Sequence, residues 1–118
     1  DLDGNLYVTN VDSIVKVNIT GAVSTFATGC SNAYDVVVDC VGNVYVSNSG
    51  TNSISKVTAQ GNVSAYVNNG LNSPSGLALD SSGNLYVTNW GSNNITKIEP
   101  QAGMRCDFVK FTVVIFFV

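Results

Sequence analysis

The sequence contains no histidine, and only 11% of its residues are charged, against about 25% in a typical globular domain. Without histidine the chain lacks the side chain most often used as a general base and as a transition-metal ligand. Five Lys and Arg residues stand against eight Asp and Glu residues, for a formal net charge of −3 at pH 7. This balance argues against nucleic acid as a partner, because phosphate backbones require concentrated basic residues.

Cysteine and long apolar runs are also scarce. Cys30, Cys40 and Cys106 are an odd number without the CxxC spacing of a zinc site. Cys30 and Cys40 flank the run AYDVVVD, and as a strand this run would hold them about 20 Å apart, too far for a disulfide. We therefore predict free thiols or bridges between copies of the chain. The apolar run 113–118 is much shorter than the roughly 20 residues that span a bilayer, so we predict no membrane span.

The chain does contain a repeat. The heptad GNLYVTN of residues 4–10 returns at 83–89, and residues 42–48 read GNVYVSN. A period near 40 residues marks a repeat architecture. Each period holds four strand signals and no window of helical periodicity. We predict an all-β fold of three four-stranded antiparallel sheets, each about 40 residues long, arranged as β-propeller blades in an incomplete ring.

A tight turn precedes each heptad strand. An aspartate in this turn can accept hydrogen bonds from the turn backbone, and a glycine three residues later tolerates a positive φ. The positions are Asp1, Gly4, Asp39, Gly42, Asp80 and Gly83. We expect these aspartates to cap turns rather than bind calcium.

The stretch PSGLALDSSGNLYVTNWGSNNITKI, residues 74–98, resembles the NHL repeat, and its LYVTNWGSNN is similar to the YVTN repeat of surface-layer propellers. The resemblance implies propeller repeats over residues 1–102, with blades near 1–32, 33–72 and from 73 to 102 onward. Residues 103–118 form a divergent apolar C-terminal segment, interpreted as an outer strand plus a tail. Propellers of this kind include binding proteins, adhesins, lyases and lactonases.

Three blades do not close a ring, because propellers close with about four to eight. The first repeat also lacks its innermost strand. We expect either that the chain is part of a larger propeller or that copies associate to complete one. The apolar segment near the C-terminus is either an innermost strand donated to the incomplete blade or an artefact of the chain boundary.

The resemblance extends to gluconolactonase-type propellers, which hold a divalent metal in their central channel through an Asn. Tyr34 and Ser75 occupy the matching positions here, and neither is a good ligand. We predict no metal site, no cofactor and no catalytic residues.

The candidate ligand-binding residues are Asn10, Asn48, Asn89 and Trp90. The three asparagines close the three heptads, so they should lie on one rim, where amides suit sugars or peptide backbone. The alternative is that each asparagine terminates its strand by bonding local backbone. Trp90 can stack on a ligand, anchor a partner or cover the channel mouth.

Three sequons, at Asn18, Asn62 and Asn94, are possible glycosylation sites in a secreted protein, although the composition gives about as many by chance. We expect a non-catalytic scaffold, extracellular or on the cell surface, that binds protein or carbohydrate or assembles with further copies of itself. The alternative is an arc of a lactonase-like or lyase-like propeller enzyme.

Overall fold

The computed structural model describes residues 1–100, which form ten β-strands and no helix. The strands are rich in Val, Ile, Thr and Tyr, whose branched or aromatic side chains favour the pleated sheet. They are β1 (Leu6–Asn10), β2 (Ser13–Val17), β3 (Val23–Thr28), β4 (Ala33–Val38), β5 (Val44–Asn48), β6 (Ser53–Val57), β7 (Val63–Val67), β8 (Pro74–Leu79), β9 (Leu85–Asn89) and β10 (Asn94–Ile98).

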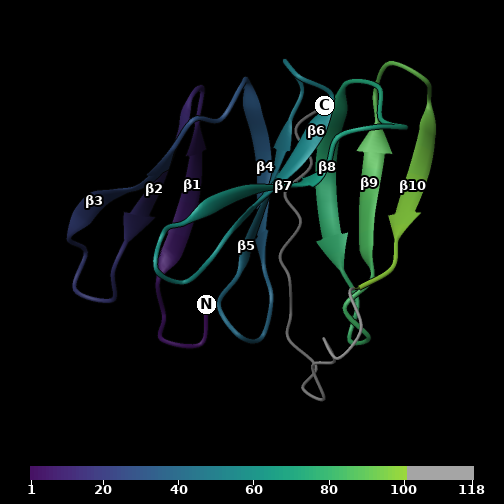
Figure 1. Cartoon of the computed structure of the whole chain (residues 1–118). Helices are drawn as coiled ribbons and strands as arrows, with labels where there is room; N and C mark the ends of the chain where they lie inside the picture. Colours follow the sequence, from purple (N-terminus) through teal and green to yellow (C-terminus); the bar gives the residue numbers. More distant parts are fainter. Residues whose placement is uncertain (101–118) are drawn as a thin grey trace.

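The strands form three antiparallel sheets that stand side by side in chain order (Figure 1). The first sheet has the order β1-β2-β3, the second β4-β5-β6-β7 and the third β8-β9-β10. Strand β4 lies against β8 of the next sheet and against β1 of the sheet before it. The sheets therefore approach one another at their inner strands, as propeller blades do around an axis.

The predicted all-β propeller architecture is confirmed. The second sheet has the four predicted strands, and the first sheet has three, without an innermost strand before β1. Three strands of the third sheet are described. The outer strand expected from residue 103 and the apolar segment 103–118 lie outside the described residues.

Each sheet has two faces, which we name by chain direction. Along β1, Leu6 and Val8 point to one face, and Tyr7 and Thr9 point to the other, because side chains alternate along a strand. We call the face that carries Leu6 and Val8 the upstream face and the opposite one the downstream face. The strand register extends these faces over the sheet, placing Ile14 opposite Thr9 and therefore on the downstream face.

Apolar side chains fill the space between neighbouring sheets. Between the first and second sheets, Ile14 and Ala27 of the first downstream face pack with Val44, Val46 and Val57 of the second upstream face. Complete burial of one such side chain stabilises the fold by about 1.5–3 kcal/mol. The inner parts of two facing sheets thus form one core.

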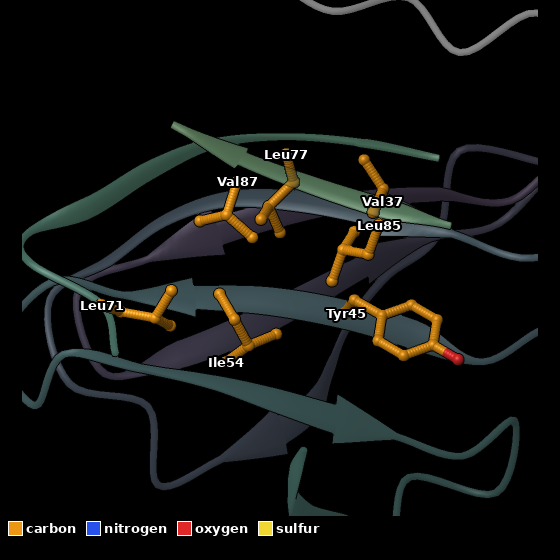
Figure 2. Packing of buried hydrophobic residues seen from close by; sticks show 7 residues of the cluster. All are labelled: Val37, Tyr45, Ile54, Leu71, Leu77, Leu85 and Val87. Atoms are coloured by element: carbon orange, nitrogen blue, oxygen red, sulfur yellow. The ribbon is translucent and has the colours of Figure 1, made fainter. Parts of the chain in front are cut away.

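The same contact recurs between the second and third sheets (Figure 2). Tyr45 and Ile54 of the second downstream face pack with Leu77, Leu85 and Val87 of the third sheet. Val37 and Leu71 complete this cluster. The repeated sequence therefore produces a repeated interface between sheets.

Candidate functional site

The turn before β5 is organised by the carboxylate of Asp39, which is buried. Its Oδ1 accepts hydrogen bonds from the backbone N–H groups of Val41 (3.0 Å) and Asn43 (2.9 Å). Its Oδ2 accepts hydrogen bonds from the Asn43 amide (2.9 Å) and the Tyr45 hydroxyl (3.2 Å). Gly42 has φ = +88°, a conformation that glycine adopts without steric cost. The carboxylate is fully engaged in holding the turn.

Asp1 and Asp80 make the equivalent bonds. Oδ2 of Asp1 accepts a hydrogen bond from Tyr7 at 2.8 Å, and Oδ2 of Asp80 accepts one from Tyr86 at 3.1 Å. Burial tends to raise the pKa of Asp80, but hydrogen bonds from Asn84, Tyr86 and Ser82 outweigh it and lower that pKa. Gly4 and Gly83 have φ values of +80° and +82°. All three turns share one structural arrangement.

Asn48 and Asn89 are the last residues of β5 and β9, at the strand ends away from the aspartate turns, and each is 2% exposed. Oδ1 of Asn48 accepts a hydrogen bond from the Ser31 N–H at 3.1 Å, and its Nδ2 donates to Ser55 Oγ at 2.8 Å. Oδ1 of Asn89 likewise accepts one from the Asn72 N–H at 3.2 Å. Each amide thus holds the loop that precedes the first strand of its sheet, β4 or β8. Their hydrogen-bonding groups are therefore used inside the protein, and we do not assign them to a ligand.

Asn10 has the same repeat position but a different environment. Its side chain is exposed, and its Oδ1 accepts a hydrogen bond from the N–H of Val11 at 3.0 Å. No loop corresponding to those at Ser31 and Asn72 precedes β1 among residues 1–100. The three asparagines therefore do not form a uniform ring of accessible amides.

We use the word rim for the loops at the end of the sheets where β1, β5 and β9 finish, at Asn10, Asn48 and Asn89. Trp90 is the most accessible large apolar side chain of this rim, with 79% of its surface exposed. Its backbone N–H donates to the Ser73 carbonyl at 3.1 Å, and the next N–H, of Gly91, donates to the Asn72 carbonyl at 3.1 Å. The Ser73 N–H in turn donates to Oδ1 of Asn52 at 2.7 Å. The loop that carries Trp90 is thus tied to the neighbouring loops of the second and third sheets.

Four non-glycine residues with positive φ lie on this same rim. They are Asn32 (48°), Asn52 (50°), Ser73 (48°) and Asn93 (53°). The left-handed region is uncommon outside glycine and is most accessible to Asn and Asp. Positive φ at these positions was not predicted from the sequence, although their location in Asn-rich loops is typical of it. These residues shape the backbone of the rim on which Trp90 lies.

The inner strands carry an unforeseen carboxylate contact. Oδ2 of Asp35, in β4, accepts a hydrogen bond from the Leu77 N–H of β8 at 2.9 Å, and the hydroxyl of Ser47 donates to the Ser75 carbonyl at 2.6 Å. These bonds join the second sheet to the third.

Tyr34, at one of the positions that match the metal-binding Asn of gluconolactonase-type propellers, is 54% exposed. No group of three or more metal-ligating side chains occurs within residues 1–100.

The sequon asparagines are all exposed. Asn18 lies in the turn between β2 and β3, where its Oδ1 accepts hydrogen bonds from Thr20 and Ala22. Asn62 lies in the turn between β6 and β7, and Asn94 begins β10. Oδ1 of Asn94 accepts a hydrogen bond from the Asn89 amide at 2.9 Å. Glycosylation at these positions stays a prediction.

The cysteines differ from one another. Cys30 is a free thiol, as predicted, and burial raises its pKa, with a smaller contribution from Asp12. Cys40 is disulfide-bonded, so of the two predicted states, a free thiol or a bridge between copies, the free thiol is wrong at that position. The predicted strand length argued against a bridge between Cys30 and Cys40, and it did not bear on other partners of Cys40. Cys106 lies outside the described residues.

Buried polar groups in the described part of the chain are all satisfied, since each buried side-chain nitrogen or oxygen has a hydrogen-bond partner. The interior of residues 1–100 therefore offers no unpaired group aimed at a ligand. In the same range no helix has the length and apolar character needed to cross a membrane. Accessible features lie on the surface, and the side chain of Trp90 on the rim is one of them.

Residues 71–98 match the NHL repeat family. A streptogramin B lyase structure shares the fold, with a TM-score of 0.63 and 15% identity over 85% of this chain and 38% of that chain. Selenomethionine-substituted virginiamycin B lyase from Staphylococcus aureus has a TM-score of 0.65 and 16% identity, over 85% of this chain and 39% of that one. A catalytically inactive variant of the same lyase with quinupristin has a TM-score of 0.56 and 18% identity, over 84% and 46%.

The chain spans less than half the length of these solved structures. At such identities the likeness shows the fold alone, and no curated protein matches the sequence. The three sheets are thus propeller blades, and an NHL repeat forms the third.

Proposed function

We propose that this chain is a non-catalytic propeller scaffold that binds a neutral ligand, a carbohydrate or a protein surface, through the rim at Trp90. The observation that carries the proposal is the 79% exposure of Trp90 on a loop whose backbone is fixed by hydrogen bonds to Ser73 and Asn72. A Trp side chain has only two χ angles and therefore loses little conformational freedom on binding, and Trp is enriched at binding hot spots.

The surroundings of Trp90 favour carbohydrate among these ligands. Ser73, Ser92 and Asn93 are neutral neighbours along or across the loop. Hydroxyl and amide groups suit the hydroxyls of a sugar, and an indole face suits its apolar C–H surface. We also propose an extracellular or cell-surface location, which the low charge content of 11% supports. Fractionation of the producing cells tests that location.

Trp90 is the only tryptophan of the chain, so its fluorescence reports directly on the proposed site. We expect titration with neutral oligosaccharides of glucose, mannose or N-acetylglucosamine to shift its emission. Calorimetry with the same sugars should show that Trp90→Ala weakens binding about tenfold or more. Val11→Ala is the matched control, because Val11 has the same repeat position in the first sheet and is also exposed. Equal affinity in the wild type and Trp90→Ala would contradict the proposal.

An arc of a lyase-like enzyme is the second candidate, and the fold similarity to the two lyases favours it. Against it, the turn aspartates Asp39 and Asp80 are held by hydrogen bonds within their turns. A metal-dependent enzyme predicts that a divalent cation raises the thermal stability, because a bound ion stabilises the native state. The scaffold proposal predicts no such shift and no turnover of quinupristin.

A further inference from the structure

The two outermost sheet faces expose side chains whose repeat equivalents are buried. On the upstream face of the first sheet, Leu6 is 65% exposed and Val8 is 50% exposed. Leu85 and Val87, at the same positions of the third sheet, are 1% and 0% exposed because they pack against the second sheet. The first sheet thus presents an interface surface without its counterpart among the described residues.

The downstream face of the third sheet shows the complementary difference. Ile95 is 67% exposed, whereas its repeat equivalents Ile14 and Ile54 are 0% exposed. Ile14 and Ile54 each contribute to the core between two neighbouring sheets. A neighbouring upstream face would bury Ile95 in the same way.

Several residues on these two end faces have the same type as residues that already pack inside the protein. Tyr86, Thr88, Ile95 and Lys97 repeat the residue types of Tyr7, Thr9, Ile14 and Lys16, which face the second sheet. Leu6, Val8 and Asn10 repeat the types of Leu85, Val87 and Asn89. Both halves of an inter-sheet contact therefore exist in exposed form, one at each end of the chain of sheets.

We propose that the upstream face of the first sheet docks onto the downstream face of the third sheet of a second copy of this chain. The contact is head-to-tail, so the second copy offers the same pair of faces in return. Residues 1–100 of two copies supply six sheets, which falls within the roughly four to eight of closed propellers, whereas residues 1–100 of three copies supply nine. A head-to-tail contact forms a ring when the rotation between copies closes, so the expected product is a closed ring of two copies.

Charge does not oppose this contact. The upstream face of the first sheet carries no charged residue in β1 or β2, and the opposing face of the third sheet carries Lys97 alone in β9 and β10. Lys16 occupies the matching position in the internal contact, with its Nζ 5.8 Å from the centres of the Tyr7 and Phe26 rings. A lysine is thus compatible with this kind of interface.

The outer strand of a sheet is exposed even where neighbouring sheets pack. Val23 of β3 is 69% exposed, but its equivalent Val63 of β7 is still 41% exposed although the second sheet is packed on both faces. Exposure of the outer strand is therefore normal in this arrangement. The exposure of the inner positions Leu6, Val8 and Ile95 is different, because their repeat equivalents are buried between sheets.

Sedimentation velocity over a dilution series tests the proposal on the wild-type chain and three variants. Val8→Glu places a charge on the upstream end face, and Ile95→Glu places one on the downstream end face. Val41→Glu is the matched control, because Val41 is 62% exposed in the turn before β5 and belongs to neither end face. All three side chains are exposed, so the fold should persist, and circular dichroism checks this.

We expect the wild type and Val41→Glu to sediment as dimers of about twice the 12.4 kDa chain mass. Both end-face variants should sediment as monomers at concentrations where the wild type is dimeric. A face-to-face dimer that uses one end face twice would be disrupted by only one of the two variants, and that outcome would overturn the head-to-tail contact. A monomeric wild type at every concentration, or species larger than a dimer, would also overturn the proposal.

Discussion

The hydroxyl of Tyr45 donates a hydrogen bond to Oδ2 of Asp39 at 3.2 Å, which joins the second strand of a blade to the turn that precedes it. The equivalent bonds from Tyr7 to Asp1 and from Tyr86 to Asp80 measure 2.8 and 3.1 Å. The Asp–Tyr pair is therefore a structural unit of the repeat. It explains why the heptad keeps its tyrosine and why an aspartate stands six residues before it.

Replacing Asp39 by alanine should lower the free energy of unfolding by about 1–3 kcal/mol, because the donors of the turn, including the buried Tyr45 hydroxyl, lose their acceptor. Chemical denaturation measures this change. Asp3→Ala is the control, since the Asp3 side chain is exposed and lies outside this network. Equal stability of the two variants would show that the carboxylate of Asp39 does not organise the turn.

Stability should decline at alkaline pH because of Tyr45. Burial, followed by the charge of Asp39, raises the pKa of this phenol in the folded protein, while an unfolded tyrosine titrates near pH 10. The unfolded state therefore releases its proton first, and the stabilisation present below about pH 10 is lost as the pH rises further. Thermal unfolding between about pH 9 and pH 11 should show a smaller decline for Tyr45→Phe than for the wild type. Parallel pH profiles would contradict the assignment.

Asn48 and Asn10 should respond differently to the same substitution. Asn48→Ala leaves the partly buried Ser31 N–H without its acceptor and should cost about 1–3 kcal/mol. Asn10→Ala should cost less than about 0.5 kcal/mol, because the side chain is exposed and bonds only its neighbour. Denaturant unfolding of both variants measures the difference. A large loss for Asn10→Ala would mean that the amide is engaged in a contact other than the one described.

Gly61 and Gly21 offer a matched test of how the sheets approach one another. Both lie in the outer hairpin turn, with φ values of +88° and +86°, so alanine is strained at either position by about 1–2 kcal/mol. At Gly61 an added Cβ would also lie 3.0 Å from the Phe26 carbonyl of the neighbouring sheet, whereas at Gly21 nothing lies within 4 Å. Gly61→Ala should therefore lower the melting temperature more than Gly21→Ala. The reverse order would place the second sheet farther from the first.

Much of the fold could be predicted because its information is local and repeated. The heptad strands β1, β5 and β9 coincide with the quoted repeat, and the side chain of Asp39 bonds residues two to six positions away. The burial of Asn48 could not be predicted in this way. It depends on Ser31, seventeen residues earlier in the chain, and hence on how one blade enters the next.

The difference between Asn10 and its equivalents has the same origin. At residues 4–10 and 83–89 the same heptad differs in exposure on one face, since Leu6 and Val8 are exposed and their equivalents Leu85 and Val87 are buried. The upstream face of the third sheet packs against the second sheet, whereas the upstream face of the first sheet has no neighbouring sheet among residues 1–100. Asp35 was within a quoted apolar run, but its bond to Leu77 spans 42 positions. Local patterns specified each blade, whereas the contacts between blades required the three-dimensional arrangement.

The face-to-face packing of successive sheets is the central claim, and methyl–methyl nuclear Overhauser effects test it most directly. With specifically labelled Ile, Leu and Val methyl groups, we predict cross-peaks from Ile14 to the valines of β5. We also predict cross-peaks from Ile54 to Leu85 or Val87, since each isoleucine shares a buried cluster with these residues. Absence of both sets of cross-peaks in the folded protein would contradict the propeller arrangement.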